Sequence, residues 1–307
     1  MSGHIYIHIG PPKTATTSLQ VAAEKLVDTR FFYAGTFQPR DRNSESLAQQ
    51  LHQACASGDR SQGHQVAERL RAECDAGKTV FLSEEMFLVH SRKVSWQKKL
   101  SELRAFLGDA PVTIIVTLRK PTAALPSLYQ ELFRGLPLCC KLSFASFCRS
   151  KYANCFDYDF LQSEILFAGF HRVRKIDFNE IATSQMSTKD LFGPDASVTD
   201  QTLDIGWENK GKTGKTTSER ALPGVTLKDL ANARGIRWLI ERTMRRGSKL
   251  RKFLRKSAES LSLRPSRQGD LIVPRELGDA LDRTHAKHLS DECRTVNIAS
   301  SEKSVPS

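Results

Sequence analysis

The beginning of the chain constrains the fold most strongly, because a strand pattern, a short loop and a helix pattern follow one another there. Residues 4–9 (HIYIHI) alternate along a strand and are rich in β-branched side chains. Residues 16–27 (TTSLQVAAEKLV) carry apolar side chains at helical spacing. Only residues 10–15 join the two patterns, so the chain is predicted to open with a strand, a tight loop and a helix.

Strand and helix patterns alternate along the rest of the chain. Apolar runs predict strands at 79–82, 112–118 and 171–178, and the second of these (VTIIVTL) is typical of a strand buried on both faces. Helical spacing predicts helices at 44–58, 62–76, 96–107, 121–134, 157–169 and 274–292. This alternation predicts an α/β fold, a P-loop-like three-layer sandwich with a central parallel sheet flanked by helices.

The composition changes in the last third of the chain. Residues 193–224 are rich in Gly, Ser, Thr and Lys and predict a long loop. Ten Lys or Arg residues then fall between Arg234 and Lys256, against one acid, Glu241. We expect an α/β domain over residues 1–222, a basic helical extension of that domain over 223–292, and a disordered tail over 293–307.

The net charge of +12 favours anionic partners, such as nucleotides, nucleic acids, sulfated glycans or membrane surfaces. No apolar run approaches the length of a membrane span, and the N-terminus lacks the pattern of a signal peptide. We therefore expect a cytoplasmic protein. The seven cysteines are scattered and lack a CxxC pair, which indicates reduced thiols and neither a disulfide framework nor a zinc site.

The loop Gly10-Pro11-Pro12-Lys13-Thr14-Ala15-Thr16-Thr17 has the composition of an anion-binding loop. Backbone N–H groups and a helix N-terminus attract an anion, Lys13 adds a positive charge, and three threonine hydroxyls add donors. The nucleotide-binding loop of kinases reads G-x-x-x-x-G-K-[ST], whereas here two residues separate Gly10 from Lys13 and no glycine precedes the lysine. This spacing argues against a nucleoside triphosphatase.

The shorter loop resembles the 5′-phosphosulfate-binding signature of sulfotransferases that use 3′-phosphoadenosine 5′-phosphosulfate (PAPS), commonly K-T-G-T-T before an apolar helix. The segment VTLRKPTAALPSLYQELFR resembles that family's 3′-phosphate signature, with Arg119 at a strand end and Ser127 eight residues later. The resemblance implies that PAPS is bound by Gly10, Pro12, Lys13, Thr14, Ala15, Thr16, Thr17, Arg119 and Ser127. Ala15 stands where the family usually has glycine, a position that alanine can fill if its φ is negative.

Two further segments match the family less closely. Ser83-Glu84-Glu85 resembles the strand-end Ser-Glu of carbohydrate-type sulfotransferases, where a glutamate takes the proton of the acceptor hydroxyl. We favour Glu85 over Glu84 as that base, although adjacent acids after a strand also commonly form a solvated turn or cap a helix. The stretch Asn209-Lys210-Gly211-Lys212 lies where the family often places a basic loop over the nucleotide, which adds Lys210 and Gly211 to the predicted site.

The resemblance implies a bacterial-type enzyme that moves a sulfuryl group from PAPS to a small-molecule or glycan acceptor, with Lys13 and a glutamate in catalysis and no metal. Two alternatives stay open. One is a P-loop nucleotide or small-molecule kinase, which needs Mg²⁺ and a carboxylate to hold it. The other is a non-catalytic protein that binds nucleic acid or a membrane surface through residues 234–256, a role less favoured because apolar residues at helical spacing there predict an ordinary helix face. The acceptor and the oligomeric state stay open.

Overall fold

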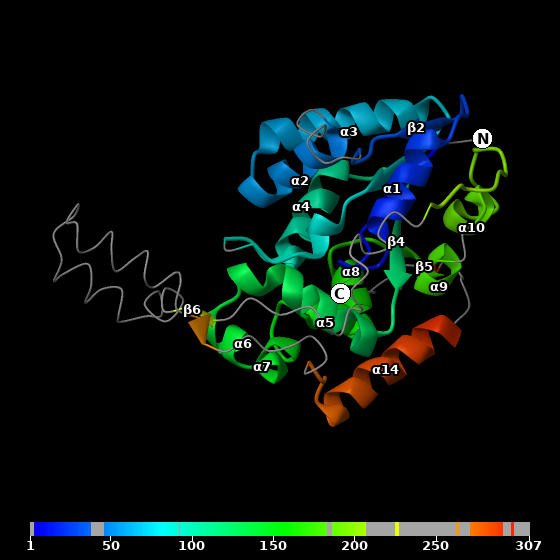
Figure 1. Ribbon diagram of the computed structural model, residues 1–307. Coiled ribbons are helices and arrows are strands. Elements are labelled where there is room, and N and C mark those ends of the chain that lie inside the picture. Colours follow the sequence, from blue (N-terminus) through cyan, green and yellow to red (C-terminus); the bar gives the residue numbers. More distant parts are fainter. Residues whose placement is uncertain are drawn as a thin grey trace, which may run out of the picture. The chain divides into compact units, whose positions relative to one another are not determined.

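The computed structural model of the protein describes residues 3–37, 46–91, 93–182, 186–206 and 271–290, and the backbone alone at 225–226, 262–263 and 296–297 (Figure 1). The chain forms two compact units. The first comprises Met1–Pro121, Asn154–Lys210 and Ala280–Ser307, and the second comprises Thr122–Ala153 and Gly211–Asp279. The first unit contains the central sheet.

The central sheet has the strand order β2-β3-β1-β4-β5-β8. Its strands are β1 (His4–His8), β2 (Phe31–Tyr33), β3 (Thr79–Ser83), β4 (Val112–Leu118), β5 (Arg172–Asp177) and β8 (Val296–Asn297). The first five are parallel, and β8 pairs with β5 in the antiparallel direction. Because parallel strands end at the same edge, the segments that follow β1, β3 and β4 come together there, at the edge where open α/β sheets bind ligands.

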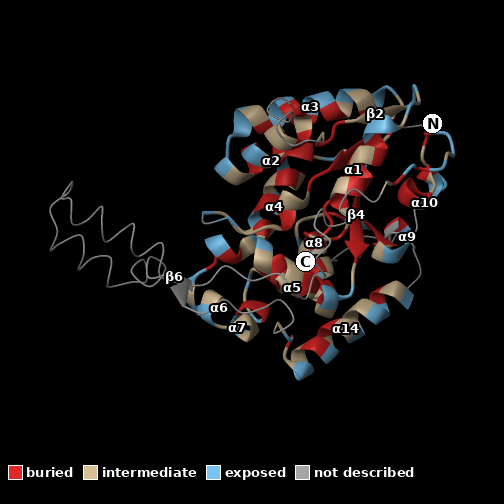
Figure 2. Ribbon diagram, in the orientation of Figure 1, coloured by how far each residue is buried: buried red, intermediate tan, exposed pale blue. Residues whose placement is uncertain are grey.

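The central strands are buried on both faces. All five residues of β3 and all seven of β4 are buried, and Figure 2 shows this continuous burial in the middle of the sheet. Strands of this kind require cover on both faces, which is the reason that a nearly all-apolar sequence predicts a parallel sheet between helices. The predicted three-layer α/β fold is confirmed.

Helices cover both faces of this sheet. The described helices of the first unit are α1 (Thr16–Lys25), α2 (Leu47–Ser57), α3 (Arg60–Asp75), α4 (Trp96–Leu107), α8 (Tyr158–Phe167), α9 (Phe178–Ala182) and α10 (Thr188–Phe192), with 3-10 turns η2 (Glu85–Leu88) and η4 (Asn154–Phe156). Helices α2, α3 and α4 pack together (Figure 1). The connections β1–α1–β2 and β3–α4–β4 run in opposite directions across the sheet, so right-handed crossovers place α1 and α4 on opposite faces. Residues of α1, α9 and α10 share one core with Tyr6 and Phe81.

Polar side chains determine where several helices begin. The side chains of Ser46, Asp59, Ser95 and Asp157 each accept a hydrogen bond from the backbone N–H three residues later, at the start of α2, α3, α4 and α8. Helix α1 differs, because the residue before it is Ala15, which forms no side-chain cap. The start of α1 is therefore open to another hydrogen-bond acceptor.

The described part of the second unit is mainly helical. It contains α5 (Pro121–Leu132), whose first residue belongs to the first unit, then η3 (Phe133–Gly135), α6 (Leu138–Leu142) and α7 (Phe144–Cys148), and the antiparallel pair β6 (Val225–Thr226) and β7 (Ser262–Leu263). The ring of Tyr129 lies 5.0–5.4 Å from the rings of Phe133, Phe144 and Phe147. Helix α14 (Arg275–Ser290) begins in the second unit and ends in the first.

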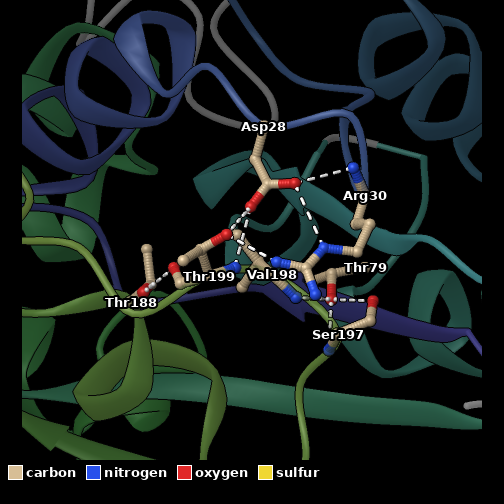
Figure 3. Close-up of polar contacts among 7 residues, drawn as sticks. All are labelled: Asp28, Arg30, Thr79, Thr188, Ser197, Val198 and Thr199. Atoms are coloured by element: carbon tan, nitrogen blue, oxygen red, sulfur yellow. Dashed lines mark hydrogen bonds and ion pairs between the residues drawn. The ribbon is translucent and has the colours of Figure 1, made fainter.

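A polar cluster fastens the segment around Thr199 to the start of β3 and to the loop after α1 (Figure 3). Asp28 accepts hydrogen bonds from the Thr199 N–H at 2.8 Å and the Thr199 hydroxyl at 2.5 Å. The Thr79 hydroxyl accepts the N–H of Ser197 at 3.1 Å. Burial alone would raise the pKa of Asp28, but hydrogen bonds from Thr199 and Arg30 outweigh it and hold this pKa well below its usual range. Thr79 begins β3, so this cluster lies at the amino ends of the strands and serves the fold.

The predicted elements with long apolar or periodic patterns are present. Strand β4 and helix α4 have the predicted ends, and β1 and α1 end within two residues of theirs. The sequence patterns did not predict β2 or the short helices α6, α7, α9 and α10. A helix of five residues has fewer than two turns, and a strand of three residues has fewer than two side-chain alternations, so these elements are too short to establish a period.

Parts of the predicted organisation fall outside the described residues. These parts include the loop with Lys210 and Gly211 and the basic segment 234–256, with its predicted nucleic-acid or membrane contacts. The predicted domain boundaries at 222 and 292 also stay predictions; Val296–Asn297, from the predicted tail, forms β8. Among the described helices, none has the length and apolar character needed to cross a membrane.

Candidate functional site

Three segments that the sequence singles out lie at the carboxyl edge of the sheet. The loop 10–17 follows β1, residues 84–85 follow β3, and Arg119 follows β4. Strands β3, β1 and β4 are neighbours in that order. The pairing continues past the strand ends, since the Glu84 N–H donates to the His8 carbonyl and the Ile9 N–H to the Ile115 carbonyl, both at 3.0 Å. The topology therefore brings the loop, the acidic pair and the arginine to one edge.

The loop has an alternating backbone conformation. Lys13 and Ala15 have φ angles of 72° and 62°, in the left-handed region, and Thr14 between them does not. In anion-binding nests, left-handed residues that alternate with right-handed ones turn successive N–H groups toward one concave side, and the positive φ angles of Lys13 and Ala15 are compatible with such a nest. The negative φ under which alanine fits easily in place of glycine is not present at Ala15. An L-residue in this region costs about 1–2 kcal/mol.

Small and buried residues determine the shape of the loop. A Cβ atom on Gly10 would lie 2.7 Å from both the His8 Nε2 and the Thr14 Oγ1, so this position requires glycine. The buried Thr14 hydroxyl donates to the Pro11 carbonyl at 2.6 Å, and Pro12 is buried. Of the residues predicted to bind PAPS, Gly10, Pro12 and Thr14 therefore shape the loop, and among these three only Gly10 and Thr14 have a backbone N–H.

His8 connects the three strand ends beneath the loop. Its Nδ1 lies 2.9 Å from the Ser83 hydroxyl and its Nε2 lies 2.9 Å from the Thr117 hydroxyl. The imidazole is fully buried, and burial lowers the pKa of His8 to about 3, so the ring is neutral at physiological pH. Since both ring nitrogens already have partners, His8 holds β3, β1 and β4 together and is not placed to act as a base.

The start of α1 has no side-chain cap and carries one buried hydroxyl, that of Thr16. The Ser18 and Leu19 N–H groups donate to the Ala15 carbonyl at 3.0 and 3.2 Å, but a helix start carries partial positive charge, and neither a side-chain cap nor an acidic residue in the first turn neutralises it here. Thr16 is 2% exposed, and its buried hydroxyl has no hydrogen-bond partner among the described residues. Leaving a buried hydroxyl unpaired costs about 1–3 kcal/mol, so its position at this helix end suits a ligand oxygen. Thr17 is half-buried beside it.

Arg119 is held in place from three sides. The Tyr158 hydroxyl accepts the Arg119 N–H at 2.9 Å and donates to the Arg119 carbonyl at 2.7 Å. The guanidinium lies 4.5 Å from the centre of the Phe178 ring and donates to the Lys13 carbonyl at 2.5 Å. Burial lowers the pKa of Arg119, although a guanidinium keeps its charge at neutral pH. The arginine after β4 is thus joined directly to the loop after β1.

The two glutamates have different environments. Glu84 is 1% exposed, and its carboxylate accepts the Met86 N–H and the Thr36 hydroxyl, each at 2.9 Å. These bonds cap the start of η2 and occupy both carboxylate oxygens. Glu85, the first residue of η2, is half-buried. The geometry therefore gives Glu84 a structural role and leaves Glu85 as the more accessible of the two glutamates.

The remaining predicted residues are not joined to this edge by described contacts. Ser127 is half-buried in α5 and belongs to the second unit, so its pairing with Arg119 stays a prediction. Sequence reasoning missed Tyr158 and Thr36. A tyrosine inside a predicted helix and a threonine in a loop carry no sequence signal for these roles, which depend on contacts 39 and 48 residues away.

The carboxyl edge of the sheet therefore combines the cations Lys13 and Arg119, the uncapped start of α1 and the carboxylate of Glu85. Such a set can bind a ligand with several phosphate or sulfate groups and can accept a proton from a hydroxyl. No family model matches the chain, and no curated protein matches it. Its function is therefore inferred from its own residues and their geometry.

Proposed function

We propose that the protein is a sulfotransferase that moves a sulfuryl group from PAPS to an acceptor hydroxyl, with carbohydrates as the first acceptors to consider. The hydrogen bond from the Arg119 guanidinium to the Lys13 carbonyl carries this proposal. It joins the two segments whose sequences separately resemble the 5′-phosphosulfate and 3′-phosphate signatures of that family. A nucleotide held at both its 5′-phosphosulfate and its 3′-phosphate requires the two segments to lie together, as this bond holds them.

In this proposal the loop and the arginine hold opposite ends of the nucleotide. The uncapped start of α1 and the Lys13 ammonium supply positive charge for the 5′-phosphosulfate, and the buried Thr16 hydroxyl, which has no partner among the described residues, supplies a donor. The guanidinium of Arg119 has five N–H donors and gives one to Lys13, which leaves others for a phosphate. The sequence resemblance alone adds Ser127, Lys210 and Gly211 as predicted nucleotide-binding residues.

The proposed reaction is an in-line transfer. The acceptor oxygen forms a new bond to sulfur while the bond between sulfur and the 5′-phosphate oxygen breaks, and Glu85 takes the hydroxyl proton. Lys13 and the loop N–H groups stabilise the negative charge that develops on the leaving oxygen. The products are the sulfated acceptor and adenosine 3′,5′-bisphosphate, and this scheme uses no metal ion.

Transfer of radiolabelled sulfuryl from PAPS to a panel of saccharides and phenols tests the proposed activity. We expect Lys13→Ala to lower the rate by about 10²–10³, the effect of removing one charge-stabilising donor. Lys25→Ala is the matched control, because Lys25 lies on α1 with a side chain 54% exposed and pairs only with Asp204 among the described residues. Equal rates in the two variants would contradict the role of Lys13, and magnesium-dependent ATP turnover without sulfuryl transfer would favour the kinase alternative.

The two neighbouring acids provide a matched test of the base. Glu85→Gln should lower kcat by about 10²–10⁴, the usual contribution of a general base, and leave binding of adenosine 3′,5′-bisphosphate unchanged. Glu84→Gln should reduce kcat much less, because a glutamine can still accept the Met86 N–H and bond to Thr36. The opposite ranking of the two variants would assign the proton transfer to Glu84.

A further inference from the structure

Lys99 of α4 is a lysine buried in the first unit, with only 1% of its surface exposed. Its ammonium donates to the carbonyl oxygen of Met86 and, at 2.7 Å, to that of Val89. The Nε2 of His52, from α2, lies 3.5 Å from the same nitrogen. Two of its three N–H donors thus face carbonyl acceptors, which explains how an ammonium group is tolerated inside the protein.

The surroundings of Lys99 also account for its charge state. Burial lowers the pKa of Lys99 to about 8, while Cys55 and Glu84 oppose this shift. The amine is therefore still mostly protonated at neutral pH, and even the neutral amine keeps two N–H donors for the two carbonyls. A buried lysine that is retained at such a desolvation cost needs a specific reason.

The carbonyls that Lys99 binds belong to the turn that carries Glu85. Met86 lies within η2, and Val89 directly follows it. Glu84 holds the start of the same turn through the Met86 N–H and reaches back to Thr36 in the loop after β2. The turn is thus bound at its start by a carboxylate and at its end by an ammonium group, and Glu85 lies between them.

We propose that Lys99 is a positioning residue for Glu85, which fixes the η2 turn through the carbonyls of Met86 and Val89 and so holds the proposed base at the carboxyl edge of the sheet. This inference rests on the proposed function. The amine of Lys99 is bonded to the turn and to none of the residues of the nucleotide site among its described contacts. Its loss should therefore affect the chemical step and leave nucleotide binding intact.

The test compares Lys99→Met with Lys98→Met. Both lysines lie on α4, but Lys98 is exposed, so its substitution removes a charge without touching the turn. We expect Lys99→Met to lower kcat about ten- to a hundredfold, the range for a small misplacement of a catalytic group, with the Kd for adenosine 3′,5′-bisphosphate within about twofold of wild type. Lys98→Met should match wild type in both quantities.

Hydrogen exchange supplies a second readout that does not depend on activity. In Lys99→Met the amides of residues 86–90 should exchange at least about tenfold faster than in wild type, because the end of the turn has lost its donor. Lys99→Gln keeps an N–H donor on a shorter side chain, so its kcat and its exchange rates should lie between those of Lys99→Met and the wild type. This variant replaces Lys99→Met in the test if Lys99→Met does not fold. A merely structural lysine would give a lower melting temperature with unchanged kcat.

The outcomes separate this inference from the proposed function. An active wild type with unchanged kcat in the folded Lys99 variants, or unchanged exchange of residues 86–90, would overturn the role of Lys99 alone. A change in Kd equal to the change in kcat would also overturn it, because Lys99 would then act on the nucleotide site. Absence of sulfuryl transfer by the wild type would overturn the proposed function, and the catalytic role of Lys99 with it.

Discussion

Replacing Ala15 by glycine tests the backbone geometry of the anion-binding loop. Ala15 has φ 62° and ψ 26°, and an alanine there costs about 1–2 kcal/mol relative to a right-handed conformation. Glycine removes this cost but gains entropy in the unfolded chain, worth about 0.4–1 kcal/mol. The alanine methyl group also packs partly against the core beneath α1, and its loss costs at most about 0.8 kcal/mol.

These contributions nearly cancel, so the free energy of unfolding of Ala15→Gly should lie within about 1 kcal/mol of wild type. Ala286→Gly is the matched control, because Ala286 is exposed within α14, where glycine costs about 1 kcal/mol. If residue 15 were instead in the right-handed conformation, glycine there would carry the usual penalty of glycine in a helix and would also lose the methyl contact. The free energy of unfolding would then fall by about 2 kcal/mol.

Urea unfolding of the two variants and the wild type measures these differences, provided that the free energy of unfolding falls with urea concentration at the same slope in all three proteins. Ala15→Gly should be at least as stable as Ala286→Gly and should bind adenosine 3′,5′-bisphosphate more tightly than wild type, because the methyl group no longer narrows the approach of the anion. A loss near 2 kcal/mol, or weaker binding of the bisphosphate, would refute the left-handed loop geometry.

Three other substitutions have defined outcomes. Gly10→Ala should lower the melting temperature and abolish bisphosphate binding, because its Cβ would lie 2.7 Å from the His8 ring; normal melting and binding would contradict the loop packing. Tyr158→Phe removes a hydroxyl that forms two hydrogen bonds to the Arg119 backbone. It should lower the free energy of unfolding in urea by about 1–3 kcal/mol and weaken bisphosphate binding. Wild-type values of both quantities would show that these bonds are dispensable. Asp28→Asn should lower the free energy of unfolding at pH 7 by about 1–2 kcal/mol. Because the folded-state pKa of Asp28 is depressed, the stability advantage of the wild type should be complete above about pH 4 and should shrink as the pH falls further. A constant difference down to about pH 2 would contradict this.

The sequence predicts those parts of the fold whose signal is local. Strand β4 is a run of apolar residues bounded by Pro111 and Arg119, and α4 has its own cap at Ser95 and ends before Gly108. The loop 10–17 is also recognisable, since its glycine, lysine and threonines lie close together in the chain. The strand order follows only in outline, because pairing depends on contacts between distant segments.

The sequence does not predict features that depend on distant partners. The choice between Glu84 and Glu85 follows from Thr36, which lies in a loop after a strand too short to be predicted. The positive φ of Ala15 could not be predicted either, because alanine disfavours that region and only the surrounding loop imposes it. The burial of Lys99 contradicts the usual exposure of lysine and depends on carbonyls of another segment.

Calorimetric titration with adenosine 3′,5′-bisphosphate tests the central proposal most directly. The wild type should bind one equivalent, and Arg119→Ala should weaken binding by at least about tenfold, the effect of removing one bidentate charged donor. Arg60→Ala, which removes an exposed arginine at the start of α3, should bind as the wild type does. No binding by the wild type, or equal binding by the Arg119 and Arg60 variants, would contradict a nucleotide site at the carboxyl edge of this sheet.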